Sequence, residues 1–185
     1  MLGIRDHQGF ADRSHGAGHQ VNAIDRIGNG PWYDRLGRLF ANNRAELLFD
    51  RPTSADPAII NDFPNEFGVP NHQPDPNQPQ VDNHDMLTGS NTSGQLHGPT
   101  YTCLDWTTSS MIPQVTGRPR VGHSWPRPCG PGGGDVRSCN WMSALTEAGC
   151  GAGINLIETG PPNPNIPTVG SGGGYGGFYC FAMSP

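Results

Sequence analysis

TYTCLDWTTSS, residues 100–110, and GGFYCFA, residues 176–182, each place one cysteine among aromatic residues. The stretch between them consists largely of Gly, Pro, Ser and Asn. The alternating pattern of residues 101–108 predicts a half-buried strand, and residues 176–183 predict the last strand. We therefore expect neighbouring core strands that each carry a cysteine, joined by long irregular loops.

The composition is that of a loop-rich domain. The chain has 185 residues, which fits one domain with a real core. Only 34% of the residues are hydrophobic, and 27 Gly and 19 Pro limit regular structure. Apolar residues are nevertheless spread along the chain, which favours a compact fold. We predict an irregular leader over residues 1–20 and a domain over residues 21–185.

Charge and hydropathy exclude two classes of partner. The net charge is −5 and every basic residue is Arg, so a polyphosphate partner such as nucleic acid is not expected. No run of eighteen apolar residues is present, so we predict no membrane span. The start lacks the apolar core of a signal peptide, whereas five cysteines without CxxC spacing favour the disulfides of an exported protein. A truncated start reconciles these two observations.

Local patterns predict many short strands and at most two small helices. Strands are expected at AIDRI (23–27), GRLFA (37–41), HDMLT (84–88), GRPRVGHSW (117–125) and GINLIETG (153–160). Helices are expected in NNRAELLF (42–49), which begins with an Asn cap, and in NWMSALTEAGC (140–150). Seven prolines at 51–82 predict a surface excursion pinned by Ile59, Ile60, Phe63 and Phe67. The fold class predicted is α+β, with long loops.

The cysteines predict disulfides without fixing every pair. Cys129 and Cys139 flank a flexible Gly-rich loop, so a local bond between them is favoured. Cys103 and Cys150 are able to close a longer loop, and Cys180 is then left over. Several connectivities satisfy the count from spacing alone.

A resemblance rests on five segments in a fixed order: HDMLTGSNTSGQ (84–95), YTCLDWTTSS (101–110), VGHSW (121–125), NWMSALTEAGC (140–150) and FYCFA (178–182). Together they resemble the endostatin-like domain family, which includes the C-terminal domain of collagens XV and XVIII and secreted bacterial proteins often labelled lectin-like. DRIGNGPWY (25–33) is similar to a stretch of the bacterial members. The resemblance covers about residues 21–182, with an insertion at 126–137.

The resemblance implies a C-type-lectin-like fold with nested disulfides. The inner disulfide corresponds to Cys103–Cys150. The outer one joins the cysteine of the last strand, here Cys180, to a cysteine of an N-terminal helix. This chain has no cysteine before Cys103. The first strand, the first helix and the outer partner are therefore predicted to be missing, which leaves Cys180 unpaired.

No spacing predicts a metal or catalytic site. Seven histidines (His7, His15, His19, His72, His84, His97 and His123) follow no HExxH or comparable pattern, so we expect no specific zinc site. The QPD triplet at 73–75 lies outside the context of a calcium-dependent lectin and is attributed to chance. Asp82, His84 and Ser124 show no arrangement that supports a Ser/His/Asp triad. We expect neither a cofactor nor catalysis.

Ligand contacts are expected from aromatic, amide and basic side chains. Trp125 and Trp141 are candidates for stacking on sugar rings, although a place in the core is favoured for both, and Trp106 is expected in the core. Asn140 offers hydrogen bonds to hydroxyl groups, and Arg118 and Arg120 offer contacts to an anionic glycan. The function expected is a secreted, non-catalytic, lectin-like module that binds carbohydrate or a matrix-like polymer. The alternative is an adhesive surface domain that binds a protein.

Overall fold

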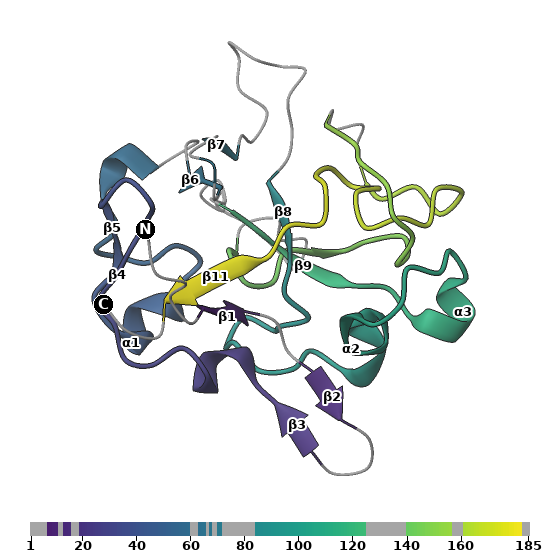
Figure 1. Ribbon diagram of the computed structural model, residues 1–185, viewed down its shortest axis with the longest axis horizontal. Helices are drawn as coiled ribbons and strands as arrows, with labels where there is room; N and C mark the ends of the chain where they lie inside the picture. The colour runs from purple at the N-terminus through teal and green to yellow at the C-terminus, as the bar shows by residue number, and fades with distance from the viewer. Residues whose placement is uncertain are drawn as a thin grey trace, which may run out of the picture.

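The computed structural model describes residues 7–10, 13–15, 19–59, 63–65, 67, 70–71, 84–124, 140–156 and 161–182. For residues 7–10, 13–15, 19 and 70–71 it describes the backbone alone. Figure 1 shows short strands and helices joined by long loops.

The secondary structure of the described residues consists of short elements. The strands are β1 His7–Phe10, β2 Arg13–His15, β3 His19–Val21, β4 Trp32–Tyr33, β5 Leu39–Ala41, β6 Phe63–Pro64, β7 Pro70–Asn71, β8 Asp85–Leu87, β9 Arg120–His123, β10 Leu145–Thr146 and β11 Tyr179–Ala182. The α-helices are α1 Arg44–Leu47, α2 Cys103–Trp106 and α3 Pro113–Thr116. The 3-10 helices are η1 Ala23–Asp25, η2 Pro57–Ile59 and η3 Pro99–Tyr101.

Two antiparallel sheets occupy the middle of the molecule. Strands β10, β9 and β8 form a three-stranded sheet in that order, and β1 pairs with β11. In Figure 1, β11 lies beside β1, and a bridge between Met86 and Gly177 joins β8 to the residues just before β11. The pairs β2–β3, β4–β5 and β6–β7 form separate ribbons. Strands β1, β2 and β3 begin before residue 20, within the segment expected to be an irregular leader.

Local sequence patterns placed several elements correctly. Strands β5, β8, β9 and β11 and helix α1 lie where they were predicted. The cap of α1 is also as expected, because the Asn43 side chain accepts a hydrogen bond from the Glu46 amide. Three predictions are wrong. Residues 23–25 form η1, residues 140–150 contain β10 in place of a helix, and residues 153–156 form one isolated bridge.

The segment around Cys103 also differs from its prediction as a strand. Residues 103–106, labelled α2, form one left-handed turn in place of a right-handed helix, with φ between 50° and 64° at four consecutive positions. This backbone conformation costs roughly 1–2 kcal/mol per non-glycine residue. The Cys103–Cys150 disulfide holds the turn, and the Thr102 hydroxyl accepts a hydrogen bond from the Asp105 amide at 3.2 Å. The pairing implied by the family resemblance is therefore confirmed. Closing a loop of this length is worth about 4 kcal/mol.

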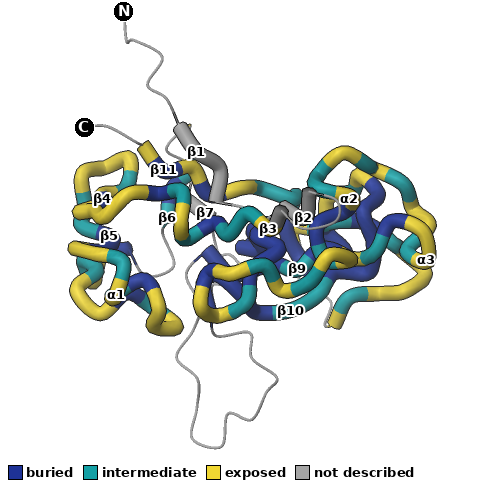
Figure 2. Tube along the Cα trace, turned by 90° about the horizontal axis from the view of Figure 1, so that it is seen from below, coloured by how far each residue is buried: buried dark blue, intermediate teal, exposed yellow. Residues whose placement is uncertain are grey.

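The apolar core lies between the sheets and α1. Trp141 is at its centre, with 0% of its surface exposed, and its ring meets those of Phe40 and Tyr179 edge to face. Its indole N–H donates to the Leu47 carbonyl at 2.8 Å. Figure 2 shows the buried trace running through the centre, with α1, β4 and β5 at one end and α2 and α3 at the other. Trp141 therefore joins segments that are far apart in the sequence.

The apolar residues predicted to anchor the Pro-rich segment 51–82 differ in burial. Ile59 is buried and Phe63 packs partly against the core, but Phe67 is 78% exposed. Ile60 lies outside the described residues. Together with the small sheets, few short helices and one disulfide, these loops are compatible with the predicted α+β class. Among the described residues, no helix is long and apolar enough to cross a membrane.

Candidate functional site

The structure does not present the predicted ligand residues on one surface. Trp141 is fully buried, so its ring is not available for stacking on a sugar. Asn140 is also buried, and its side-chain oxygen accepts hydrogen bonds from the amides of Met142 and Ser143. Both residues hold the core together, and their assignment to a ligand surface is corrected.

The predicted basic contacts are separated as well. Arg120 donates to the hydroxyls of Ser143 and Thr146, at 2.8 and 3.2 Å, which ties β9 to the strand that follows it in the sheet. Arg118, two residues earlier in the chain, is exposed.

Trp125, Cys129 and Cys139 lie outside the described residues. Cys180 is an exposed residue of β11 and is not part of the Cys103–Cys150 disulfide.

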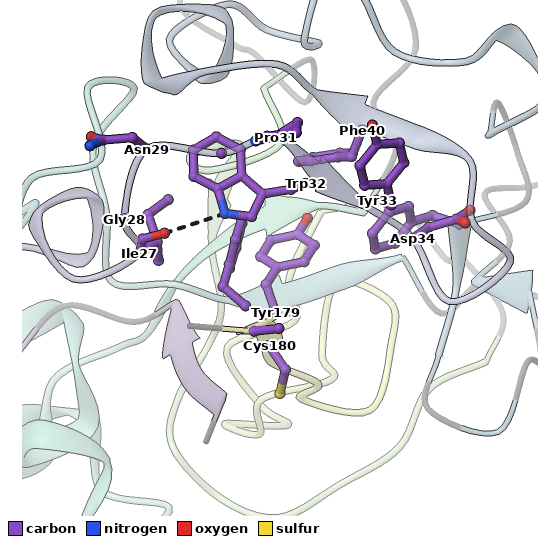
Figure 3. Close-up of a pocket in the computed structure, with 14 residues that line it drawn as sticks. Ile27, Gly28, Asn29, Pro31, Trp32, Tyr33, Asp34, Phe40, Tyr179 and Cys180 are labelled. Atoms are coloured by element: carbon purple, nitrogen blue, oxygen red, sulfur yellow. Dashed lines mark hydrogen bonds between the residues drawn. The ribbon is translucent and has the colours of Figure 1, made fainter. Parts of the chain in front are cut away.

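A pocket of about 540 Å³ opens at the end of the molecule that carries β4 and β5. It is formed by the loop at residues 27–34, the aromatic residues Phe40 and Phe63, and β11. Figure 3 shows Trp32 and Tyr179 facing this space, with Asn29 and Tyr33 on either side. Trp32 is almost entirely buried, whereas Tyr33 is 59% exposed. The pocket thus combines a fixed aromatic floor with an accessible aromatic rim.

Local hydrogen bonds fix the loop that forms the pocket. The Trp32 indole N–H donates to the Ile27 carbonyl at 3.3 Å, and the Arg44 guanidinium donates to the Gly28 carbonyl. Gly30 has φ +86°, and a Cβ there would lie 2.7 Å from the Asn42 carbonyl oxygen. The position therefore requires glycine. The GNGPWY sequence gives a pre-formed site because its backbone is tied to α1 and its tryptophan to the core.

The pocket has little net charge available for a ligand. Asp34 is the carboxylate in its lining, but its side chain is 0% exposed. One oxygen accepts from the amides of Leu36 and Arg38, and the other accepts from the Arg38 guanidinium at 2.6 Å. The polar side chains left at the rim are the amide of Asn29 and the hydroxyl of Tyr33. Such a site suits a neutral ligand with an apolar face and hydrogen-bonding edges.

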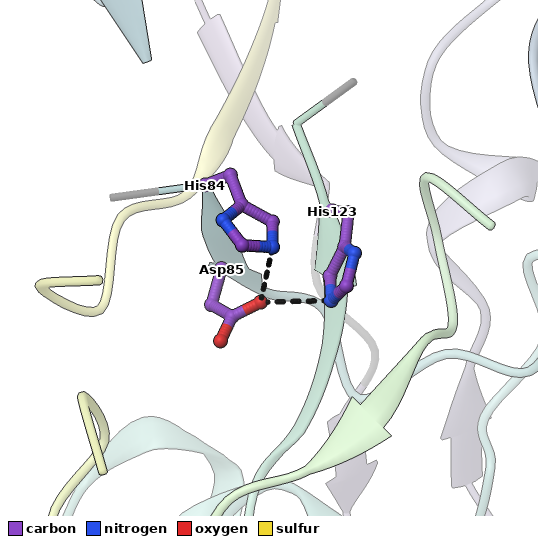
Figure 4. Close-up of side chains that lie close together, drawn as sticks. All are labelled: His84, Asp85 and His123. Carbon is purple, nitrogen blue, oxygen red and sulfur yellow. Dashed lines mark ion pairs between the residues drawn. The ribbon is translucent and has the colours of Figure 1, made fainter. Parts of the chain in front are cut away.

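A second group of interest is buried between β8 and β9. His84, Asp85 and His123 are all buried, and one ligand atom from each lies within 4.8 Å of the others. The Asp85 Oδ1 atom lies 3.0 Å from His123 Nε2 and 3.7 Å from His84 Nε2. Figure 4 shows both imidazoles directed toward this oxygen. Among the described residues, this is the group able to hold a metal ion, which differs from the expectation that the histidines form no such group.

Glu147 adds a second carboxyl group next to Asp85. Burial and the neighbouring Asp85 carboxylate raise the pKa of Glu147 to about 9. Burial alone would raise the pKa of Asp85, but the adjacent His123 and His84 outweigh it and hold that pKa below its usual value. Burial, and after it Asp85, also raises the pKa of Tyr179 well above its usual range. The cluster is therefore electrostatically connected to β11.

Local spacing did not reveal this cluster. Asp85 and His123 are direct partners in the β8–β9 register, and the Ser124 amide donates to the His84 carbonyl at 2.7 Å. The available signal was the presence of His and Asp at the start of one predicted strand and of His in another. These side chains come together only through the antiparallel register of β8 and β9, which neither segment predicts by itself. The pocket was likewise missed, although its GNGPWYD turn was predicted.

Among the other histidines, only His97 has a side chain that the structure describes, and it lies outside this group. His7, His15 and His19 lie in β1, β2 and β3, and His97 is exposed with its ring against Tyr101. His72 and the QPD triplet lie outside the described residues.

Comparisons with protein-family models, curated proteins and solved structures give no match. The candidate sites therefore rest on the geometry of this chain.

Proposed function

We propose that this domain is a non-catalytic, extracellular binding module for a neutral carbohydrate. The observation that carries the proposal is the aromatic-lined pocket of about 540 Å³ beside the loop at residues 27–34. This volume falls within the range of small-molecule sites. The Cys103–Cys150 disulfide supports an oxidising, extracellular environment.

The pocket matches the chemistry of a sugar ring. A saccharide has an apolar C–H face and a periphery of hydroxyl groups. The exposed ring of Tyr33 offers a platform for the apolar face, and the Asn29 amide offers both a donor and an acceptor to hydroxyls. Because the Asp34 carboxylate is already paired with Arg38, a neutral sugar fits better than a charged one. The ligand class thus moves from the anionic glycan suggested by the arginines to a neutral saccharide.

The test is binding of the full chain to an array of neutral and acidic glycans, followed by calorimetric titration of the best ligand. Tyr33→Ala is expected to weaken binding about tenfold, because it removes the stacking surface. Phe49→Ala is the matched control, since Phe49 is 54% exposed and lies outside the pocket lining. It is expected to leave the affinity unchanged.

Three results would contradict the proposal. They are equal affinities for the wild type and Tyr33→Ala, equal losses in Tyr33→Ala and Phe49→Ala, and binding restricted to acidic glycans. Circular dichroism of each variant should match that of the wild type, because both side chains are exposed.

A second candidate function is adhesion between copies of this domain. It is favoured by three exposed apolar side chains around α3, those of Met111, Ile112 and Val115, which are the kind of surface that associates in water. Sedimentation measurements over a range of concentrations test it. Association that is lost in the triple Ser variant supports adhesion, and a monomer at every concentration contradicts it.

A further inference from the structure

Two residues of the buried cluster, Asp85 and His123, have side-chain atoms without an aligned hydrogen bond. Both oxygens of Asp85 and the Nε2 atom of His123 are buried without a hydrogen-bond partner. His123 Nε2 and Asp85 Oδ1 lie 3.0 Å apart, so the two side chains interact electrostatically. Because these atoms are buried, they depend on polar neighbours inside the protein in place of water. Three atoms able to bind a metal, one from each residue, thus lie within 4.8 Å of one another.

We propose that these three residues bind a divalent transition-metal ion of the zinc class. His84 Nε2, His123 Nε2 and Asp85 Oδ1 are the ligand atoms. In a tetrahedral zinc site with bonds of about 2.0–2.1 Å, neighbouring ligand atoms lie about 3.3 Å apart. The observed separations from Asp85 Oδ1, 3.0 and 3.7 Å, lie on either side of this value. Small side-chain rotations are therefore enough to form the site.

The donor set distinguishes between classes of ion. Calcium and magnesium prefer six or more oxygen ligands, whereas imidazole suits zinc, copper, iron and nickel. Two imidazoles and one carboxylate are a donor set of zinc sites that keep a fourth coordination position for water or another ligand. Calcium, the ion associated with sugar binding in C-type lectins, is therefore the wrong ion for this cluster.

The surroundings hold the ligands in position. The pairing of β8 with β9 fixes Asp85 opposite His123, and the two imidazole rings stand edge to face with centroids 4.2 Å apart. Behind them, the Gly172 amide donates to Glu147 Oε2 at 2.8 Å. A Cβ on Gly172 would lie 3.0 Å from Glu147 Oε1 and 3.5 Å from Asp85 Oδ2, so this glycine leaves room beside both carboxyl groups. The Gly172 amide thus holds the Glu147 carboxyl group next to the cluster.

The ion would have a place in the molecule separate from the sugar pocket. None of the three ligands lines that pocket. The ligands join β8 to β9, and Glu147 lies just beyond β10 of the same sheet. The metal would therefore stabilise the pairing of strands in the three-stranded sheet. Metal binding does not depend on whether the domain binds carbohydrate.

Zinc titration of the full chain, prepared without a polyhistidine tag and stripped with EDTA, tests the proposal. We expect one zinc ion per chain to remain after gel filtration at micromolar concentration. His123→Gln is expected to lower the affinity about 100-fold or more, because even partners outside the ligand shell contribute about 10–100-fold. His97→Gln is the matched control, since this histidine is exposed and lies outside the cluster.

A second control addresses the N-terminal histidines. Replacing His7, His15 and His19 together by Gln is expected to leave zinc binding unchanged. Loss of zinc in this variant, full retention in His123→Gln, or no retained zinc in the wild type would each overturn the proposal.

Hydrogen exchange locates the ion without any substitution, in case His123→Gln does not fold. Zinc added to the stripped wild type should slow amide exchange at residues 84–87 and 120–124. Exchange slowed at β2 and β3 instead, or unchanged throughout, contradicts the assignment. The cobalt-substituted protein should also show the visible absorption of a four-coordinate site, and the spectrum of a fully hydrated ion would count against it.

Discussion

The molecule contains two buried regions that meet at β9 but are built in opposite ways. Around Trp141, aromatic rings pack against one another, and polar atoms such as the indole N–H and the Tyr179 hydroxyl each have a carbonyl partner. Around Asp85, carboxyl and imidazole groups are equally buried, but several of their atoms have no hydrogen-bond partner. In the first region the polar atoms named here are paired, and in the second several are not. Burial alone therefore does not distinguish a structural core from a site.

The largest expected effect is in the aromatic region. Trp141→Ala removes a fully buried ring and leaves a cavity beside Phe40 and Tyr179, so it should lower the free energy of unfolding by about 3–5 kcal/mol. Urea unfolding measures the loss. Tyr33→Ala, at an exposed aromatic position, should change stability by less than about 0.5 kcal/mol. If both variants lose a similar free energy of unfolding, Trp141 does not contribute more to stability than an exposed aromatic residue.

A slightly smaller effect is expected at the junction of the two regions. Gly122 lies in β9 beside His123, and a Cβ there would come within 1.9 Å of the Trp141 carbonyl oxygen. Gly122→Ala must therefore displace backbone, and we expect a loss of about 3 kcal/mol in the free energy of unfolding. Gly98→Ala is the control, because its Cβ would meet only the Tyr101 ring, at 3.2 Å. Equal stability of the two variants would mean that β9 and Trp141 do not need this close approach.

The comparison also explains what the sequence could predict. Helix α1 and strands β5, β8, β9 and β11 were predictable, because an Asn cap and short apolar alternations are local signals. The disulfide followed from the family resemblance. The burial of Trp141 was not predictable with the same certainty, because its partners are the carbonyls of Leu47 and Asp50, far away in the sequence. The left-handed turn at 103–106 was missed because its residues favour other conformations when considered singly.

The candidate sites follow the same rule. The turn of the pocket was visible in GNGPWYD, but its wall comes from β11, which pairs with the unexpected strand β1. In the polar cluster, each histidine was visible in the sequence, but their convergence depends on the register of β8 against β9. Chemistry that arises from strand pairing is therefore hidden from a search for spaced motifs along the chain.

The stabilisation expected from zinc is smaller than the losses at Trp141 and Gly122, but it separates the two regions by their response to an ion. At a free zinc concentration 100 times the dissociation constant, binding to the folded state adds about 2.7 kcal/mol to the free energy of unfolding. For a chain of this size, that corresponds to a rise of about 5–10 °C in the melting temperature over the EDTA-treated protein.

His123→Gln should lose this rise because it removes one ligand of the ion. Trp141→Phe, which keeps a ring in the aromatic region, should be less stable in EDTA yet gain as much from zinc as the wild type. If zinc stabilises His123→Gln as well, or if Trp141→Phe loses the gain, the two regions do not respond independently. The polar cluster would then have no ion-binding role separate from the core.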